Sequence, residues 1–270
     1  MCWIAWLNFL LQKAIWMKTD TMNTHEISGI EDLHAVVSSL HSEWKTIDIW
    51  WRGLSQTQYQ LVPGARRNSC SRVQEDNLAN RFIREAINRY PNCPTLTDVK
   101  DDPRWLFLMQ HYRLKTRLLD WTESPLIASL FCVKDSQNSD GVIWALNPAI
   151  LNENQNNQKA ILDVGKGLDL TQSPFTQPPE IDRDIDKIIA INTQQNDFRM
   201  FVQQSVFTMH GSSKPLEEYE GREKFLRKYF IPAESKLALW VSLQQLGIKE
   251  SYLFPDLDHL SNELNRLFSP

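Results

Sequence analysis

Glycine is scarce in this chain. Only nine of the 270 residues are Gly, about half the share of ~7% that is usual in proteins. The sequence contains neither G-x-x-x-x-G-K-[ST] nor G-x-G-x-x-G, and the pair Gly165 and Gly167 has no third member. Both motifs use glycine to bring backbone close to a phosphate, so their absence excludes the standard glycine-rich nucleotide-binding loops. A phosphate would therefore have to be recognised by side chains.

Metal-binding and hydrolase motifs are also missing. There is no C-x-x-C, no H-E-x-x-H and no G-x-S-x-G, and the six His residues are not grouped at ligand spacing. We therefore expect no metal cofactor and no α/β-hydrolase site. The four Cys residues lack the spacing of a disulfide framework, which favours a reducing compartment and predicts a cytoplasmic protein.

No charge of one sign dominates. The formal net charge is −4 and the pI is about 5.9, so no overall field attracts nucleic acid. A basic stretch does occur at Arg66, Arg67, Arg72, Arg81 and Arg84. Acidic residues share this stretch, and a solvated helix face accounts for it. Nucleic acid is therefore not expected as a partner.

The apolar N-terminal segment, MCWIAWLNFLLQKAIW, is shorter than the ~20 residues that span a bilayer. It also lacks the basic region and cleavage site of a signal peptide. We expect residues 1–26 to be an extension outside the fold, with Met17 or Met22 as an alternative start. The other interpretation is a short interfacial or partner-binding helix. Residues 27–270 are expected to form one domain without a membrane span.

Periodicity and capping residues locate the elements. Helices are predicted at 30–44 with a Ser28–Glu31 capping box, at 72–90 with a Ser71–Gln74 box, and at 103–112, 125–132, 233–246 and 255–268. Strands are predicted at 47–51, 141–146, 187–191, 206–209 and 225–231. A long Asn- and Gln-rich loop, with room for a short helix, is predicted at 152–183. Because strands and helices do not alternate strictly, we expect an α+β fold, with a mixed or split antiparallel sheet flanked by helices.

The first candidate site segment is Trp50-Trp51-Arg52-Gly53. Burying an Arg at the end of a strand costs free energy unless its guanidinium has a hydrogen-bond or ion-pair partner. The planar guanidinium suits a carboxylate or a phosphate. An internal salt bridge is the alternative explanation.

Polar residues also interrupt the apolar segment from Trp105 to Phe131. They are Gln110, His111, Thr116, Arg117, Asp120 and Thr122. Buried polar groups must be paired, and an Arg117–Asp120 pair within a structural network would account for two of them. Taken together, the six resemble the wall of a site.

Two further segments carry polar residues. Residues 201–208 contain Gln203 and Gln204, which can orient a ligand or cap a sheet edge. Residues 253–258 contain Asp256, which we expect to cap the final helix.

The four segments together resemble the FRG domain family, which is named for an aromatic-Arg-Gly tripeptide, here Trp51-Arg52-Gly53. The stretch QHYRLKTRLLDWTESP resembles the family's Q-H-Y-G-x-x-T-R-L-L-D-W-T run leading into S-P. Residues 201–208 resemble its Q-x-G-x-F segment, and LFPDLD resembles its closing motif. Three positions depart from the pattern, because Arg113 and Ser205 replace Gly and Lys115 replaces Pro. The change at Arg113 affects a tight turn, and the change at Ser205 narrows the close approach of a ligand.

The resemblance implies a bacterial or phage-associated protein whose tripeptide is similar to the first motif of ADP-ribosyltransferases. It implies an NAD-dependent toxin or defence enzyme with a protein or nucleotide acceptor. The implied catalytic residues are Arg52, Thr116, Asp120 and Gln203. The implied cofactor-binding residues are Trp51, Arg52, Gly53, His111, Arg117, Trp121, Gln204 and Phe207. Transferases usually place a Glu where this chain offers Gln203 or Gln204, and Asp120 is the alternative source of negative charge. The other interpretation is a non-catalytic ligand- or partner-binding regulatory module.

Overall fold

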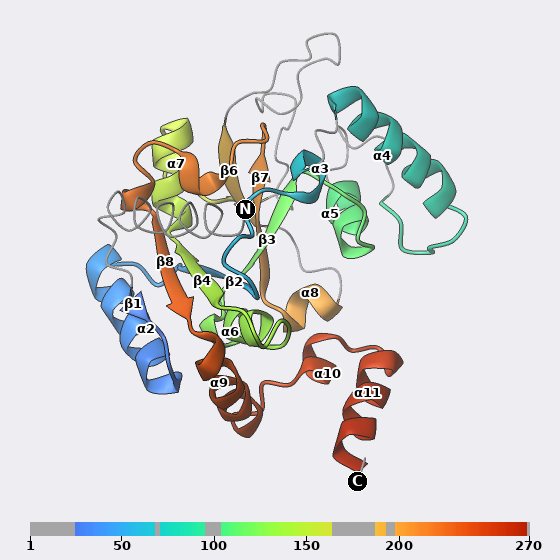
Figure 1. Cartoon of the computed structure of the whole chain (residues 1–270). Helices are drawn as coiled ribbons and strands as arrows, with labels where there is room; N and C mark the ends of the chain where they lie inside the picture. The colour runs from blue at the N-terminus through green and yellow to red at the C-terminus, as the bar shows by residue number, and fades with distance from the viewer. Residues whose placement is uncertain (1–24, 68–70, 95–103, 164–186, 193–197, 269–270) are drawn as a thin grey trace, which may run out of the picture.

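A mixed sheet organises the molecule in this computed structural model (Figure 1). The structure describes residues 25–67, 71–94, 104–163, 187–192 and 198–268. Within them, eight strands follow the order β1-β8-β4-β2-β3-β7-β6-β5. The strands are β1 (His25–Glu26), β2 (Trp50–Leu54), β3 (Leu118–Thr122), β4 (Gly141–Leu146), β5 (Leu162–Asp163), β6 (Ile188–Asn192), β7 (Ser205–His210) and β8 (Leu226–Ile231). The outer pairs β1–β8 and β5–β6 are parallel, whereas the inner pairs are antiparallel.

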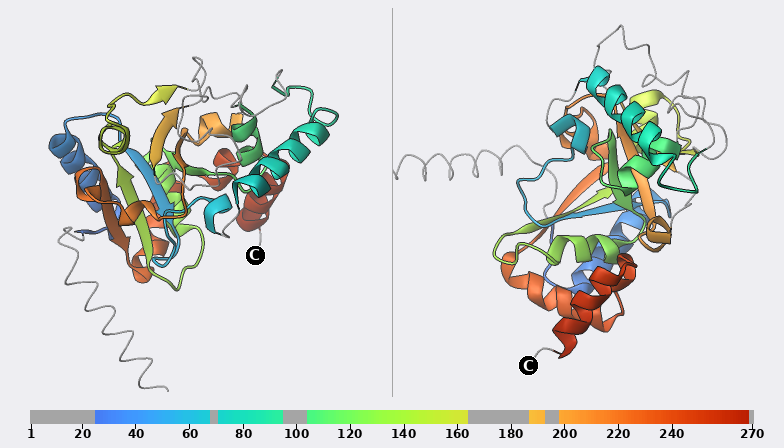
Figure 2. Two further views of the ribbon diagram at one scale, coloured as in Figure 1. Left: turned by 90° about the horizontal axis from the view of Figure 1, so that it is seen from above. Right: turned by 90° about the vertical axis from the view of Figure 1, so that its right-hand side faces the viewer.

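Helices flank this sheet (Figures 1 and 2). They are α2 (Ile30–Trp44), α3 (Gly64–Arg67), α4 (Arg72–Ala86), α5 (Arg104–His111), α6 (Pro125–Val133), α7 (Pro148–Asn156), α8 (Phe198–Val202), α9 (Ala233–Gln245), α10 (Glu250–Leu253) and α11 (Leu257–Phe268). Two short 3₁₀ helices span Leu216–Glu218 and Arg222–Lys224. The expected α+β single-domain fold is therefore confirmed.

Three apolar clusters hold the helices on the sheet. One joins α2, α6 and α9 to strands β2, β4 and β8. A second joins β3, β6 and β7 to α4, α5 and α8. A third includes Leu151 of α7 and Leu216, and it packs on side chains of β2, β3, β4 and β6. Strands β2 and β3 thus lie where two helical groups meet.

The sheet opens between β2 and β3. These strands share a single residue pair, Trp51 with Thr122. Each of them pairs over five residues with its other neighbour, β2 with β4 and β3 with β7. Backbone groups beyond the shared pair therefore lack their usual ladder partners across this opening.

The strand that carries the aromatic-Arg-Gly tripeptide begins later than expected. We predicted a strand at 47–51 that ends at Arg52, but β2 starts at Trp50 and places Arg52 and Gly53 in its middle. Ile47 is 87% exposed and lies outside the strand. The mistake came from counting an exposed Ile as part of a buried apolar run.

Helix starts were predicted with mixed success. The Ser71–Gln74 capping box of α4 is present, as is the Ser124 cap of α6. The predicted Ser28–Glu31 box is wrong, because Gly29 is the N-cap of α2 and makes no side-chain cap bond. The Ser28 N–H instead donates to Asp32.

One further expectation needs correction. Helix α4 ends at Ala86 rather than near residue 90, and its buried residues include Ala79 and Ile83. The expected loop at 152–183 begins in the short helix α7, which Asn147 caps. Its part from 164 to 183 lies outside the described residues, as do residues 1–24 of the expected N-terminal extension. No helix in the described ranges is long and apolar enough to cross a bilayer.

Gly53 is required by packing rather than by backbone conformation. A Cβ built on it would lie 1.8 Å from the carbonyl oxygen of Ala128 in α6. Only glycine lets α6 approach the strand this closely. This close packing fixes the backbone next to Arg52.

We predict that Gly53→Ala lowers the free energy of unfolding by about 3 kcal/mol or more, because backbone must move to accept the methyl group. Urea unfolding followed by circular dichroism measures the change. Gly29→Ala is the control, since its Cβ would meet only the Glu31 side-chain end at 3.3 Å. Equal stability of the two variants would contradict the packing role.

Candidate functional site

A cavity of about 440 Å³ lies at the sheet opening. Ligand pockets range over roughly 300–1,000 Å³, so its size suits a small-molecule site. Its wall includes seven of the residues predicted from sequence: Trp51, Arg52, Gly53, Thr116, Asp120, Trp121 and Gln203. Segments that are far apart in the chain therefore meet at this cavity. The described residues contain no group of three His, Cys, Asp or Glu placed to hold a metal ion.

Arg52 reaches across the opening between β2 and β3. Its Nη1 donates a hydrogen bond of 2.5 Å to the backbone carbonyl oxygen of Asp120. Its Nε is buried and has no hydrogen-bond partner among the described residues. Burial chiefly lowers the pKa of Arg52, and the positive charge of Arg67 lowers it further against the opposing effect of Asp120. One edge of the guanidinium is therefore left to bind an anion.

A side-chain relay fixes the Asp120 carboxylate. Thr116 Oγ1 donates to Gln110 Oε1 at 2.5 Å, and Gln110 Nε2 donates to Asp120 Oδ2 at 2.8 Å. Thr116 Oγ1 also accepts from the Leu118 N–H at 3.1 Å. All three relay side chains, from Thr116, Gln110 and Asp120, line the cavity. Gln110 was one of the six polar residues noted in sequence, but we did not include it among the predicted site residues.

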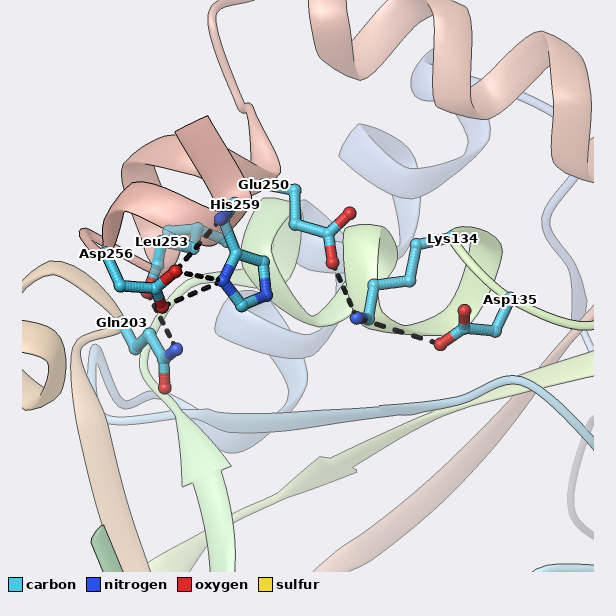
Figure 3. Close-up of polar contacts among 7 residues, drawn as sticks. All are labelled: Lys134, Asp135, Gln203, Glu250, Leu253, Asp256 and His259. Atoms are coloured by element: carbon cyan, nitrogen blue, oxygen red, sulfur yellow. Dashed lines mark hydrogen bonds and ion pairs between the residues drawn. The ribbon is translucent and has the colours of Figure 1, made fainter. Parts of the chain in front are cut away.

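Gln203 is oriented by the C-terminal part of the chain. Its Nε2 donates to the Leu253 carbonyl at 2.8 Å, and Figure 3 shows its amide oxygen turned away from that carbonyl. Thr122 Oγ1 also donates to the Gln203 backbone carbonyl at 2.7 Å. Because Leu253 offers only an acceptor, the amide cannot flip, and Oε1 is kept as an acceptor on the cavity wall.

The 250–259 segment is itself anchored beside the cavity. Arg199 stacks over the Phe254 ring at 4.6 Å, and the His259 ring stacks on Phe254 at 4.5 Å. Lys134 pairs with Glu250 at 2.9 Å (Figure 3). These contacts fix the Leu253 carbonyl that orients Gln203.

Asp256 caps α11 as expected from sequence. It accepts the His259 backbone N–H at 2.9 Å and also contacts the His259 ring. These two hydrogen bonds, the backbone one first, lower the pKa of Asp256.

The predicted Arg117–Asp120 pair is wrong. Arg117 is buried and forms a bidentate pair with Glu75 of α4, through Nε at 2.8 Å and Nη2 at 2.9 Å. Arg66 Nη2 lies 3.5 Å from the same carboxylate. Side chains alternate between the two faces of a strand. Arg117 and Asp120 are three residues apart, so their side chains point to opposite faces. Arg117 does not line the cavity, and its geometry gives it a structural role instead of the predicted cofactor contact.

Three other predicted cofactor-binding residues do not line the cavity. Phe207 is buried in the core and packs edge-to-face on Phe107 at 5.1 Å. Gln204 is exposed and adopts a left-handed conformation with φ of 47° in the turn before β7. His111 packs against Tyr112 at the end of α5.

Trp121 belongs to a second polar group behind the wall. Its Nε1 donates to Thr208 Oγ1 at 2.9 Å, and the same hydroxyl contacts His210 Nε2 at 2.9 Å. Burial, together with the charges of Arg52 and Arg66, lowers the pKa of His210 to about 3. His210 is therefore neutral at ordinary pH and adds no further positive charge to that of Arg52.

Most of the cavity's charge was not predicted. Beside Arg52, the cavity is lined by Arg67, Arg113, Lys115 and Arg199. Asp120 is the sole carboxylate among the described lining residues. Such an excess of positive charge favours an anionic ligand.

The departures from the family pattern locate three of the lining residues. Arg113 stands where the pattern has Gly, and its φ of 62° is in the left-handed region that favours glycine. Lys115 and Ser205 also line the cavity. The departures at Arg113 and Lys115 were the signal in the sequence for these two missed cations, but we did not interpret them as added charge.

We predict that Arg117→Met lowers the free energy of unfolding by about 3–5 kcal/mol, because it leaves the Glu75 carboxylate buried with a weakened set of partners. Arg117→Lys keeps the charge but loses the bidentate geometry, and is expected to fall between this variant and the wild type. Urea unfolding measures both. A loss below about 1 kcal/mol for Arg117→Met would indicate that the pair is not structural.

Comparison with protein families supports the resemblance. The FRG domain model matches residues 48–141, which include β2, α3 to α6, β3 and the start of β4. Comparisons with curated proteins and with solved structures found no match. The matched region supplies Arg52, Thr116 and Asp120, while Gln203 comes from beyond it. The chain is therefore an FRG domain-containing protein, with the domain matched over residues 48–141.

Proposed function

We propose that this protein is an ADP-ribosyltransferase-like enzyme that uses NAD as its ADP-ribose donor. One observation carries the proposal: the Arg52 guanidinium extends into the sheet opening, is fixed by a carbonyl oxygen, and keeps a buried Nε without a partner. An arginine that is fixed but not neutralised is suited to hold a diphosphate through charge-assisted hydrogen bonds. Arg67 adds a second positive charge nearby.

The remaining wall residues suit the other parts of the donor. Thr116 and Gln203 offer oxygen atoms that accept hydrogen bonds from ribose hydroxyls or from the nicotinamide amide. Trp51 and Trp121 are 1% and 3% exposed. They therefore form an apolar wall and do not offer free faces for stacking.

Transfer breaks the bond between the ribosyl carbon and the nicotinamide nitrogen. A new bond then forms between that carbon and a nucleophile of the acceptor, which gives up its proton. Positive charge develops on the ribosyl carbon as the first bond breaks, and a fixed negative charge stabilises it. Asp120 supplies this charge in the described part of the cavity wall, held by Gln110. Gln203 is neutral and serves only to position the ligand.

The acceptor is proposed to be a protein side chain or a nucleotide, with water as acceptor in a hydrolytic side reaction. A role in bacterial toxin or defence systems follows from the family resemblance and remains a prediction.

One observation favours a second candidate function, a non-catalytic nucleotide-binding module. The residue oriented by the C-terminal segment is Gln203, where transferases usually have a Glu. A module of this kind would bind the nucleotide in the same cavity without releasing nicotinamide. Binding and turnover must therefore be measured separately.

We predict that Arg52→Ala weakens NAD binding about tenfold or more, because it removes charge-assisted hydrogen bonds to the diphosphate. Isothermal titration calorimetry measures binding. Transfer of label from radiolabelled NAD to lysate proteins, together with nicotinamide release, measures activity.

Arg81→Ala is the control for charge, since this exposed residue of α4 lies away from the cavity and pairs with Glu85. Arg52→Lys keeps the charge but loses the planar fork, and should bind less tightly than the wild type. Equal NAD affinity in wild type and Arg52→Ala would contradict the proposal.

We predict that Asp120→Asn lowers nicotinamide release by about 10²-fold or more while ADP-ribose binding changes little, because the carboxylate acts on charge that develops during bond cleavage. The amide is close in size and can still bond Gln110. Calorimetry with ADP-ribose and a nicotinamide release assay test the two parts. Wild-type binding without any release would favour the non-catalytic module.

A further inference from the structure

Two of the cavity's cations have no partner in the described part of the protein. Arg52 donates to Asp120, Arg67 Nε donates to the Val62 carbonyl at 2.8 Å, and Arg199 stacks on an aromatic ring. Arg113 and Lys115 also line the cavity, but neither side chain makes a hydrogen bond or ion pair within the described residues. Both are exposed, so their charges are available to a ligand.

Backbone hydrogen bonds fix the turn that carries these two side chains. The Arg113 N–H donates to the Gln110 carbonyl at 2.9 Å, and the Leu114 N–H donates to the Met109 carbonyl at 2.9 Å. These bonds close the end of α5 with Arg113 in the left-handed region. Glycine would adopt this conformation with less strain, so the turn does not account for an arginine here.

The same segment is fixed to α3. The Ala65 N–H donates to the Thr116 carbonyl at 3.0 Å, and Lys115 lies against Gly64, with side-chain carbons 3.6 Å from the position of a Gly64 Cβ. Arg67 is one turn further along this helix. Arg67, Arg113 and Lys115 are thus on adjoining parts of the wall, contributed by α3 and by the turn that follows α5.

The number of cations exceeds what a diphosphate needs. A nucleotide diphosphate carries two negative charges in its bridge, and Arg52 with Arg67 can match them. The cavity wall adds Arg113 and Lys115 without adding a carboxylate beyond Asp120. Uncompensated like charges repel each other, so such a pair favours a further anionic group.

We propose that Arg113 and Lys115 form a phosphomonoester subsite, and that the preferred nucleotide carries one phosphate more than NAD, on the ribose of its adenosine half. This inference rests on the proposed function, because it places the diphosphate at Arg52. A phosphomonoester has about two negative charges at neutral pH and three acceptor oxygens. The planar guanidinium of Arg113 and the ammonium of Lys115 suit these oxygens.

Isothermal titration calorimetry with ADP-ribose and ADP-ribose 2′-phosphate tests the proposal without turnover. The wild type is expected to bind the 2′-phosphate compound at least about tenfold more tightly, since charge-assisted hydrogen bonds to the added phosphate are gained. Arg113→Gly and Lys115→Ala are each expected to reduce this preference several-fold while ADP-ribose affinity changes much less. Arg113→Gly is conformationally suited to its turn, and its melting temperature should equal or exceed that of the wild type.

Arg81→Ala is the control and should keep the full preference. Equal wild-type affinity for the two compounds would overturn the subsite and leave the proposed function standing. The subsite would also be overturned if both variants weakened the binding of both compounds equally. The two cations would then attract any anion without contacting the added phosphate. Failure of the wild type to bind either compound would overturn the proposed function and the subsite with it.

Discussion

The position of Arg52 in the sheet opening is the constraint on which the site depends. Strands β2 and β3 share one residue pair, and beyond it the Arg52 guanidinium donates to the Asp120 carbonyl in place of a regular ladder. Gly53 on the same strand lets α6 approach and fixes the backbone from which Arg52 extends. Asp120, in turn, is paired on its other side with β7. The opening is therefore fixed by the packing and hydrogen bonds of the sheet itself. The cavity forms there, where the two groups of helices meet.

Two arginines of the matched region differ in their partners, and this difference separates a structural role from a ligand-binding one. Arg117 donates to both oxygens of the Glu75 carboxylate in the interior, through Nε and Nη2, and ties α4 to the start of β3. Arg52 meets only a carbonyl oxygen and keeps a buried Nε without a partner. Breaking a buried, hydrogen-bonded ion pair destabilises the fold, whereas a guanidinium with an open edge is suited to a ligand. The buried His210 is neutral at ordinary pH, so it adds no further positive charge to this region.

Local signals predicted the fold well where the determinants lie close in sequence. The strand at Gly141–Leu146 and the helix after Ser124 follow from an apolar run and from a cap with proline. The cap at Asp256 was also read correctly.

Contacts between residues that are far apart in the chain could not be predicted from the sequence. Glu75, 42 residues before Arg117, takes the arginine that we assigned to Asp120. Arg67 and Arg199 reach the cavity from α3 and α8, whose positions depend on tertiary packing. Arg113 was visible in the sequence as a departure from glycine, but only the structure shows that its turn faces the cavity, where its charge can act on a ligand.

The most direct test of the account is a crystal structure of the protein with ADP-ribose bound. The account predicts a phosphate oxygen within hydrogen-bond distance of Arg52 Nε, inside the opening between β2 and β3. A ligand bound elsewhere, or a diphosphate that does not contact Arg52, would contradict it.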